Sequence, residues 1–387
     1  MGGFRITMSA VYSKIKTHLW VLSGGRCQFE GCNAPLWRDE VTLQTMNRSY
    51  VAHIIAREPN GTRGDEKLSE LLAEDIGNLM LLCDAHHRLI DGDGSEYPVE
   101  RLREMKRSHE ERIATLTALR ENRKSHVILY GANVGGHSFP LGWNMAVDAM
   151  LPRYYPAEQP AIELSLINSP FQDHEPDYWV NERNNLNRQY ADKVRSRLAL
   201  RDIQHLSIFA LAPQPLLIEF GRLLSDIPAA EVYQLHREPP NWAWQDRQTR
   251  VRYEVLEPEV EFENVALNLS LSATIDDSRI TDVLGPAISI WRMTIDSPNN
   301  DFLKQPDDLR EFRNAYRALL DRIKARHGQD QILHTFPAVP NSVAIEMGRV
   351  WMPKADMQYL VYDQNSKLGG FTPALSSRIE EDGNDAG

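Results

Sequence analysis

Cysteine is scarce in this sequence of 387 residues, which holds only Cys27, Cys32 and Cys83. Three thiols are too few for a disulfide scaffold in a chain of this length, and they fit a reducing compartment. Long hydrophobic runs are absent as well, because none approaches the about 18 apolar residues that a membrane-spanning helix needs. The first residues also lack the apolar core of a signal peptide. We therefore expect a cytoplasmic protein that does not bind a membrane.

An excess of positive charge is also lacking, since the net charge is −11. Residues 1–124 hold 18 Lys and Arg and 18 Asp and Glu, so the whole negative balance lies in the rest of the chain. An acidic region is poorly suited to bind DNA phosphates, and a neutral region binds DNA weakly as a single copy. If the first region acts on DNA, we expect oligomerisation to raise its affinity through multivalency.

The three cysteines fall into one pattern together with a histidine. Four residues separate Cys27 from Cys32, and His86 follows Cys83 by three positions. Three thiolates and one imidazole are a ligand set of structural zinc sites, so the pattern predicts a bound Zn²⁺. The next residue, His87, cannot bind the same ion without straining the backbone, and it is free to face elsewhere.

Histidines near this pattern suit phosphodiester hydrolysis. The reaction needs a water to lose a proton near neutral pH, and an imidazole has the right pKa for that step. It also needs a cation beside the leaving oxygen, and Mg²⁺ or Mn²⁺ serves there with few protein ligands.

The spacing of these residues resembles the HNH (ββα-metal) nuclease family. By this resemblance, His53 ends a first strand as the general base, Asn78 enters the second strand and orients the imidazole of His53, and His87 binds the catalytic Mg²⁺ or Mn²⁺ from the following helix. The family usually has an acidic residue or a histidine just before the base, where this chain has Ala52. We expect Asp91, one helical turn beyond His87, to supply the missing metal ligand.

A duplication runs through the second part of the chain, where short β-rich runs alternate with helices as in α/β architecture. Each copy predicts a strand, a proline-containing loop and a helix. An open α/β sheet binds ligands at such loops, and a helix N-terminus there favours a phosphate. We interpret the Glu and Arg of each copy as a structural pair on one helix face. The matched residues are Phe209, Pro213, Glu219, Gly221 and Arg222 in the first copy, and Phe336, Pro340, Glu346, Gly348 and Arg349 in the second.

Two fused Rossmann-like halves resemble the SAVED domain, a pair of CARF-like units that senses cyclic oligonucleotides. The domain order resembles the HNH–SAVED effectors of CBASS, the cyclic-oligonucleotide antiphage system of bacteria. The resemblance implies double-stranded DNA as substrate, a cyclic di- or trinucleotide as activator, and a homo-oligomer on activation. It also implies an α+β zinc-stabilised ββα-metal (HNH) endonuclease domain at 1–120 and an α/β SAVED domain at 126–375 with repeats at 126–255 and 256–375. The polar residues 121–125 predict a linker between the two domains. The acidic tail at 376–387 has no apolar periodicity, so we expect it to be disordered.

A cyclic oligonucleotide needs aromatic planes for its bases and donors for its phosphates. Trp242 and Trp244, which follow the last strand of the first repeat together with Arg247, are candidates to stack on bases, a contact worth about 1–3 kcal/mol per base. Burial in the core is the alternative for each tryptophan. Lys367, at the matching place after the second repeat, can meet a phosphate. The loops that start the two duplicated helices complete a two-sided pocket with Pro213, Gln214, Pro340, Asn341 and Ser342.

Two other functions are compatible with the sequence. Ala52, in place of the usual metal ligand, suggests a zinc-stabilised DNA-binding module without catalytic activity. The chain could also be a restriction endonuclease whose C-terminal half reads modified DNA, although the acidic balance of residues 125–387 argues against a DNA-reading surface there. Plasmid digestion with Mg²⁺, with and without cyclic oligonucleotides, separates these functions.

Overall fold

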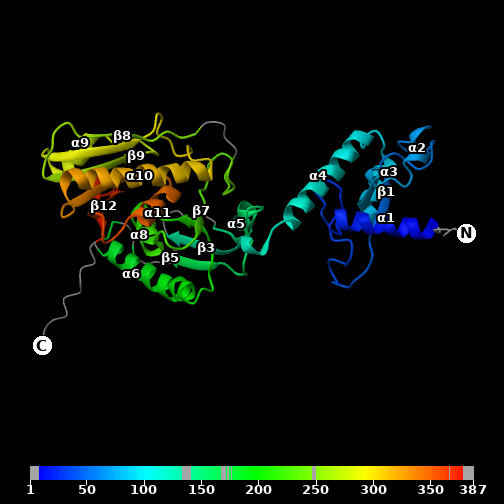
Figure 1. Cartoon of the computed structure of the whole chain (residues 1–387), viewed down its shortest axis with the longest axis horizontal. Coiled ribbons are helices and arrows are strands. Elements are labelled where there is room, and N and C mark those ends of the chain that lie inside the picture. Colours follow the sequence, from blue (N-terminus) through cyan, green and yellow to red (C-terminus); the bar gives the residue numbers. More distant parts are fainter. Residues whose placement is uncertain are drawn as a thin grey trace, which may run out of the picture. The chain divides into compact units, whose positions relative to one another are not determined.

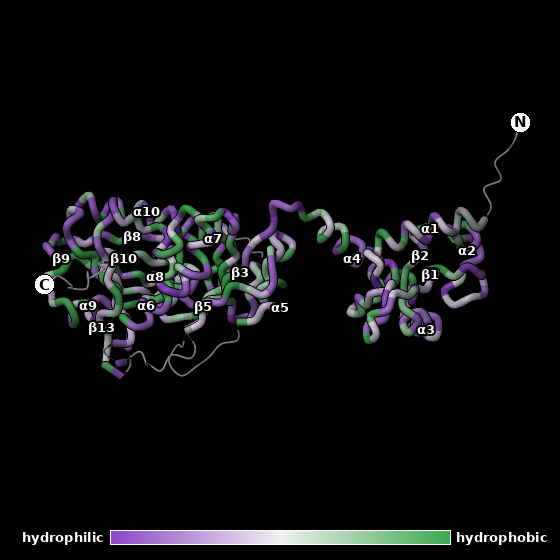
Figure 2. The backbone as a smooth tube through the Cα atoms, turned by 90° about the horizontal axis from the view of Figure 1, so that it is seen from below, coloured by the Kyte–Doolittle hydropathy of each residue, from purple (hydrophilic) through white to green (hydrophobic). Residues whose placement is uncertain are grey.

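The computed structural model describes residues 8–132, 141–166, 171, 174–175, 177–245, 250–365 and 367–377. The chain divides into two compact units, residues Met1–Arg120 and Glu121–Gly387 (Figure 1). Among the described residues, no helix is long and apolar enough to cross a membrane, and hydrophobic and hydrophilic stretches alternate along both units (Figure 2).

The N-terminal unit is built around a short antiparallel hairpin followed by a helix. The strands β1 and β2 pair so that His53 lies opposite Leu79, and α3 follows β2 directly, which confirms the expected strand–strand–helix order. All four residues of β2 are buried, because this apolar run packs on both of its faces. The elements are α1 (Met8–Leu22), β1 (Tyr50–His53), α2 (Leu68–Leu71), the 3₁₀ turn η1 (Ile76–Asn78), β2 (Leu79–Leu82), α3 (Asp84–Gly92) and α4 (Val99–Thr117).

The C-terminal unit begins with a sheet of parallel strands in the order β5, β3, β6, β7, and the short β4 also pairs with β3. The elements that form this part are η2 (Glu121–Arg123), β3 (Lys124–Ala132), α5 (Trp143–Met150), β4 (Tyr155–Pro156), β5 (Ile162–Leu166), α6 (Tyr178–Tyr190) with its extension η3 (Ala191–Arg195) and α7 (Ser196–Ala199), β6 (Leu206–Leu211), α8 (Gln214–Leu224) and β7 (Ala230–Val232).

A second sheet repeats this arrangement. Its parallel strands lie in the order β10, β9, β11, β12, with the antiparallel strands β8 and β13 at the two edges. The elements are β8 (Glu254–Leu256), β9 (Asn264–Ser270), α9 (Asp277–Leu284), β10 (Ile288–Thr294), α10 (Pro306–His327), β11 (Ile332–Ala338), α11 (Asn341–Val350), β12 (Gln358–Asn365) and β13 (Gly370–Ser376). The identical strand order confirms the two Rossmann-like repeats that the duplication predicts.

Three of the expected boundaries need correction. The strand β3 begins at Lys124, so the last two residues of the predicted linker belong to the first sheet. The boundary between repeats at residues 255 and 256 divides β8, which pairs with β10 and therefore belongs to the second repeat. The predicted tail starts too early, because Ser376 lies in β13 and Ser377 bonds to Tyr359 through its backbone and its hydroxyl. Residues 378–387 lie outside the described residues.

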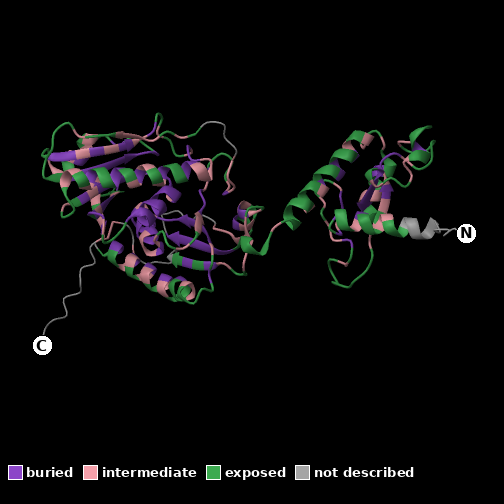
Figure 3. Ribbon diagram, in the orientation of Figure 1, coloured by how far each residue is buried: buried purple, intermediate pink, exposed green. Residues whose placement is uncertain are grey.

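The helices α8 and α11 pack on each other by a reciprocal contact. A Cβ on Gly221 would lie 1.9 Å from the carbonyl oxygen of Ile345, and a Cβ on Gly348 would lie 1.9 Å from the carbonyl oxygen of Ile218. Only glycine allows the two backbones to approach so closely. Both helices are buried along most of their length (Figure 3), so their crossing is the centre of the core that the repeats share.

The predicted structural role of the Glu–Arg pairs is confirmed by their burial. The carboxylates of Glu219 and Glu346 are each 3% exposed, and each accepts from the arginine three residues later. Arg349 also donates to the carbonyl oxygens of Ser225 and Pro228 in the first repeat, so this pair ties α11 to the end of α8.

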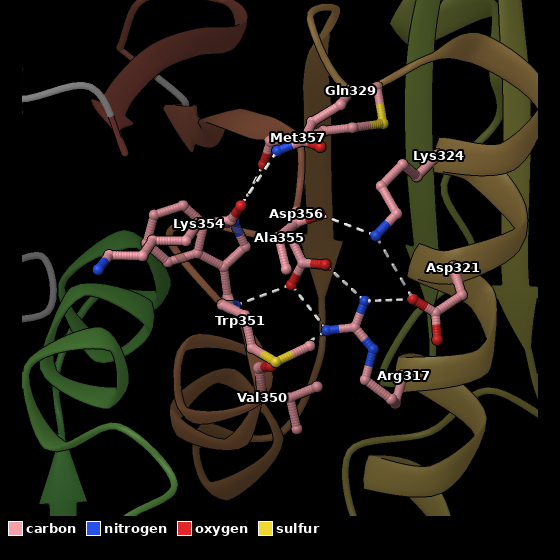
Figure 4. Close-up of polar contacts among 11 residues, drawn as sticks. Arg317, Asp321, Lys324, Gln329, Val350, Trp351, Lys354, Ala355, Asp356 and Met357 are labelled. Atoms are coloured by element: carbon pink, nitrogen blue, oxygen red, sulfur yellow. Dashed lines mark hydrogen bonds and ion pairs between the residues drawn. The ribbon is translucent and has the colours of Figure 1, made fainter.

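A second arginine–carboxylate pair, with a buried carboxylate and a half-buried arginine, joins α10 to the segment that follows α11 (Figure 4). Arg317 donates through Nη1 and Nη2 to the two carboxylate oxygens of Asp356, at 2.7 and 2.5 Å. The same carboxylate, 3% exposed, accepts from the backbone N–H of Met352 at 2.8 Å. Because such a two-bond pair is geometrically specific, it holds α10 at one position along the sheet.

Candidate functional site

The predicted zinc ligands come together in the N-terminal unit. The ligand atoms of Cys27, Cys32, Cys83 and His86 all lie within 4.8 Å of one another. The Nδ1 atom of His86 is 3.1 Å from the sulfur of Cys83 and 3.7 Å from that of Cys27. Four ligand atoms that share a single Zn²⁺, each at about 2.0–2.3 Å from the ion, are separated from one another by similar distances. The four residues therefore fit a tetrahedral zinc site.

The surroundings of this cluster set the protonation of its ligands. Burial raises the pKa of the Cys27 thiol to about 12, so without a cation this group stays a neutral thiol near neutral pH, and a bound Zn²⁺ would have to displace its proton. Burial lowers the pKa of His86, which keeps its imidazole neutral and able to coordinate. The ring of Phe29 stacks on His86 with centroids 4.1 Å apart and fixes its orientation. Sequence reasoning missed Phe29, although it lies between the first two cysteines.

His53 lies at the end of β1, as predicted, with one ring nitrogen engaged. Its Nε2 is 3.1 Å from the carbonyl oxygen of Ala73, so this nitrogen carries the hydrogen and donates it. The lone pair is then on Nδ1, which has the form of a nitrogen that can accept a proton from water. The side chain is half-buried.

Asn78 is buried at the end of η1, immediately before β2, but its predicted contact with the imidazole of His53 is wrong. Its side-chain oxygen accepts from the backbone N–H of Ile55 at 2.8 Å, and its amide donates to the carbonyl oxygens of Ile55 and Leu72 at 3.0 and 3.2 Å. Its own carbonyl oxygen accepts from the N–H of Ile54. Asn78 therefore fixes the backbone that leaves β1, and it positions His53 through the chain rather than through the ring.

His87 and Asp91 face each other on α3, one turn apart. The Nδ1 atom of His87 is 3.6 Å from Oδ2 of Asp91. Two ligands that each lie about 2.1 Å from one Mg²⁺ are at most about 4.2 Å apart, so this spacing fits a shared cation. The ring of His87 also packs against Tyr50 at 5.3 Å, whereas His86 turns toward the cysteines. The two adjacent histidines thus face different sites.

An arginine that sequence reasoning missed lies beside Asp91. The Nη2 atom of Arg63 is 3.4 Å from Oδ1 of Asp91, and the arginine side chain is only 5% exposed. Nothing in its polar loop of glycines and charged residues distinguishes Arg63 from an exposed arginine, so the sequence carried no signal for it.

In the C-terminal unit, the two helix-starting loops meet across the repeats. The amide of Gln214 donates to the carbonyl oxygen of Val339 at 3.1 Å, and the amide of Asn341 donates to that of Ala210 at 3.4 Å. Pro213 and Pro340 are the residues just before α8 and α11. The predicted pairing of these loops is present, but both amide side chains are used to join the repeats.

Ser342 does not face a pocket, which corrects its prediction as a ligand contact. Its side chain is fully buried, and its hydroxyl donates to the side-chain oxygen of Gln234 at 2.8 Å. The same oxygen accepts from the backbone N–H of Ser342 at 3.2 Å. Gln234, which follows β7, therefore caps the start of α11.

The prediction that Trp242 stacks on a base is also wrong, because its ring is 2% exposed. Phe209 stacks on Tyr233 at 4.4 Å, and Trp242 meets Phe209 edge-on at 5.3 Å. The second repeat holds the same trio, since Phe336 stacks on Tyr362 at 4.4 Å and meets Phe371 edge-on at 5.1 Å. Trp242 is thus the core counterpart of Phe371.

The remaining candidates differ in exposure. Trp244 is half-buried and packs edge-on against His236 at 5.9 Å. Lys367 is exposed in the turn between β12 and β13, and its Nζ is 3.3 Å from Nδ1 of His174, which follows β5 of the first repeat. This contact places the turn of the second repeat beside a loop of the first. Arg247 lies outside the described residues.

Residues 186–376 match the family model of SAVED, described as the SMODS-associated and fused to various effectors sensor domain. The C-terminal unit contains a SAVED domain. The match begins inside α6, so β3 and β5 of the first sheet lie before the matched residues. No curated protein matches the chain.

Several solved structures are similar to this chain. They include a Cap4 SAVED/CARF-domain containing receptor of Acinetobacter baumannii, 13% identical over 81% of this chain and 66% of that chain, with a TM-score of 0.42. The same receptor with the cyclic trinucleotide 2′3′3′-cAAA is 14% identical over 81% and 67%, with a TM-score of 0.44. The Cap4 receptor of Moraxella osloensis is 12% identical over 72% and 59%, with a TM-score of 0.41. The chain thus spans 59–67% of the length of these receptors.

Proposed function

We propose that this chain is an antiphage effector of bacteria, in which a cyclic oligonucleotide bound to the SAVED domain activates a metal-dependent HNH endonuclease in the N-terminal unit. The observation that carries the proposal is that a SAVED domain follows a strand–strand–helix unit in which His53 ends the first strand, with His87 and Asp91 facing each other on the helix. Double-stranded DNA is the proposed substrate.

The residues of the N-terminal unit divide the work of phosphodiester hydrolysis. His53 keeps Nε2–H on the carbonyl oxygen of Ala73, so its Nδ1 takes the proton from the attacking water. His87 and Asp91 hold a Mg²⁺ or Mn²⁺, which supplies charge stabilisation to the phosphate and the leaving oxygen when bound. Cys27, Cys32, Cys83 and His86 hold a structural Zn²⁺ and thereby fix the start of α3.

In the SAVED domain, the ligand site is proposed at the carboxyl ends of the parallel strands. The starts of α8 and α11 meet there, and Lys367 and His174 lie at the same edge, where they offer donors to a phosphate. Trp244 is the aromatic candidate that keeps partial exposure. A cyclic di- or trinucleotide is the proposed ligand class. The matched family is described as a sensor domain, and the sequence resemblance to SAVED domains implies this class of ligand.

Plasmid digestion tests the catalytic part. With Mg²⁺ or Mn²⁺ and a panel of cyclic di- and trinucleotides, the wild-type chain should degrade DNA only with an activating ligand. His53→Ala should abolish cleavage, whereas His18→Ala, a change of an exposed histidine on α1, should leave it intact. Equal activity of His53→Ala and wild type would overturn the assignment of the base.

The same digestion separates the alternatives. Cleavage of modified DNA without any cyclic oligonucleotide would identify a restriction endonuclease. DNA binding with one Zn²⁺ per chain and no cleavage under any condition would identify a non-catalytic zinc module.

Light scattering alongside cleavage tests the control mechanism. Because residues 1–124 have no net positive charge, a single copy should hold DNA weakly, and ligand-driven assembly should raise molecular mass and activity together. Lys367→Ala should reduce both responses. Lys354→Ala is the matched control, because Lys354 is also exposed but lies before β12 rather than after it (Figure 4). Full activity from a ligand-free monomer would exclude this mechanism.

A further inference from the structure

Arg63 is a buried arginine that connects the two halves of the candidate nuclease centre. Its Nε donates to the carbonyl oxygen of Ile54 at 3.0 Å, and Nη2 reaches that of His53 at 3.5 Å, so the guanidinium holds the end of β1. Its Nη1 donates to the carbonyl oxygen of Ile90 in the last turn of α3. Nη2 also pairs with Oδ1 of Asp91 at 3.4 Å. One side chain thus contacts the base's backbone and a metal-ligand candidate.

The loop before α2 is shaped to deliver this side chain. Arg63 has φ of 67°, a left-handed conformation that is costly for arginine. The next residue must be glycine, because a Cβ on Gly64 would lie 2.1 Å from the carbonyl oxygen of Pro59. The hydroxyl of Thr62 donates to the carbonyl oxygen of Asp91 at 3.3 Å, so the loop also anchors to the end of α3. The strained conformation is held by these contacts.

The chemistry of the position favours arginine over any other cation. Carbonyl oxygens at the C-terminus of α3 carry the negative end of the helix dipole, which attracts a positive charge. The planar guanidinium offers five N–H donors in fixed directions and can serve several acceptors together, whereas an ammonium is a compact point charge. With Oδ1 of Asp91 held by Arg63, Oδ2 is the oxygen turned toward Nδ1 of His87.

We propose that Arg63 is a positioning residue of the nuclease centre, which sets the separation of His53 from the His87–Asp91 pair and selects the oxygen of Asp91 that faces the cation. The inference rests on the proposed function, and it adds a residue that neither the sequence pattern nor the zinc cluster identifies. Arg63 is too buried to touch DNA, so it acts only through its partners.

Binding of Mn²⁺ to the full zinc-loaded chain tests this role without DNA or activator. Electron paramagnetic resonance of free Mn²⁺ gives the affinity of wild type, Arg63→Lys and the control Arg88→Lys. Lysine keeps a positive charge near Asp91 but cannot donate to all four acceptors. The variant therefore changes the orientation of Asp91 and the end of β1 without changing the charge repulsion that the cation meets. Partners that orient metal ligands typically contribute about 10–100-fold to metal affinity or activity. We therefore expect Arg63→Lys to weaken Mn²⁺ binding by about 10-fold or more. Arg88 forms an exposed pair with Asp84 on the same helix, and its variant should bind as wild type.

Cleavage at saturating Mn²⁺ gives the second readout. A misplacement of about 1 Å at a catalytic centre can cost about 100-fold in rate, so Arg63→Lys should remain slow even when Mn²⁺ is saturating. Zinc content and the unfolding temperature show whether the variant is folded, and Arg63→Gln, which keeps a planar donor group but no charge, replaces it if it is not. Arg63→Gln should then also weaken Mn²⁺ binding, although removal of a nearby positive charge by itself favours a cation.

The outcomes distinguish this inference from the proposed function. If wild type cleaves DNA and binds Mn²⁺, and Arg63→Lys does both equally well, Arg63 is not a positioning residue and only the inference fails. The inference also fails alone if Arg63→Gln, used as the replacement, matches wild type. If wild type neither cleaves DNA nor binds Mn²⁺ with any activator present, the proposed nuclease fails and the inference with it.

Discussion

Replacement of Gly221 by alanine is the sharpest test of the way the two repeats join. The new Cβ would lie 1.9 Å from the carbonyl oxygen of Ile345, whereas a carbon and an oxygen in contact stand about 3.3 Å apart. The helices must therefore separate locally by about 1.4 Å. Overpacking of this kind costs about 1–3 kcal/mol, and the upper end applies because both clashing groups are backbone-fixed. The higher helix propensity of alanine offsets about 1 kcal/mol, which leaves a net loss of about 2 kcal/mol.

Thermal unfolding of the C-terminal unit measures this loss. For a unit of this size, 1 kcal/mol corresponds to about 2–4 °C, so the midpoint should fall by about 4–8 °C. Gly142→Ala is the matched control, because a Cβ there meets nothing within 4 Å. Gly348→Ala should behave like Gly221→Ala, and the double variant should lose less than the sum, because one displacement of the helices relieves both clashes. A Gly221→Ala midpoint equal to that of the control would refute the close crossing.

Three further expectations follow from buried groups. Cys83→Ala should lose the Zn²⁺ and destabilise the N-terminal unit but not the SAVED domain, which metal analysis and unfolding by circular dichroism would show. Burial, aided by nearby arginines, lowers the pKa of His205 from 6.5 to about 4, so between these pH values the unfolded chain binds a proton that the folded chain does not bind. The free energy of unfolding should therefore fall as pH falls from about 6.5 to about 4. Denaturation at several pH values should show a smaller fall in His205→Gln than in wild type. Arg317→Met leaves the buried carboxylate of Asp356 without its arginine partner, so the free energy of unfolding in urea should fall by about 3 kcal/mol. Arg310→Met, at an exposed ion pair of the same helix, should lower it by about 1 kcal/mol or less.

In the N-terminal unit, spacing in the sequence predicted positions well and contacts poorly. His53, Asn78 and His87 are on the elements expected, and the four zinc ligands converge, because local periodicity and ligand number constrain them strongly. The hydrogen-bond partner of Asn78 was predicted wrongly. A side-chain amide can bond to backbone groups as readily as to an imidazole, and the sequence does not show which backbone N–H and C=O groups need a partner. The buried role of Arg63 could not be predicted for a related reason, because its hydrogen-bond acceptors come from separate segments of the chain.

In the C-terminal unit, the duplication predicted the fold because each repeat preserves the residues that the crossing needs. The same duplication explains the error at Trp242. Its loop is polar and flanked by prolines, which indicates a surface position, but the ring fills the place that Phe371 fills in the other repeat. Phe371 reaches that place from the hairpin strand β13 and Trp242 from an irregular loop. Equivalent core positions served by unlike segments cannot be matched by sequence spacing.

The crossing of α8 and α11 also limits how a ligand can act on the SAVED domain. Both helices start at the loops that meet across the repeats, and their backbones are in contact at Gly221 and Gly348. Sliding of one helix along the other would drive Cα atoms into the facing carbonyl groups, and closely packed interfaces of this kind change between discrete arrangements rather than deforming continuously. Arg349 adds a second tie from α11 to the end of α8. If a ligand binds at the helix starts as proposed, we expect it to act through a rotation of the repeats about this crossing rather than through sliding of the helices.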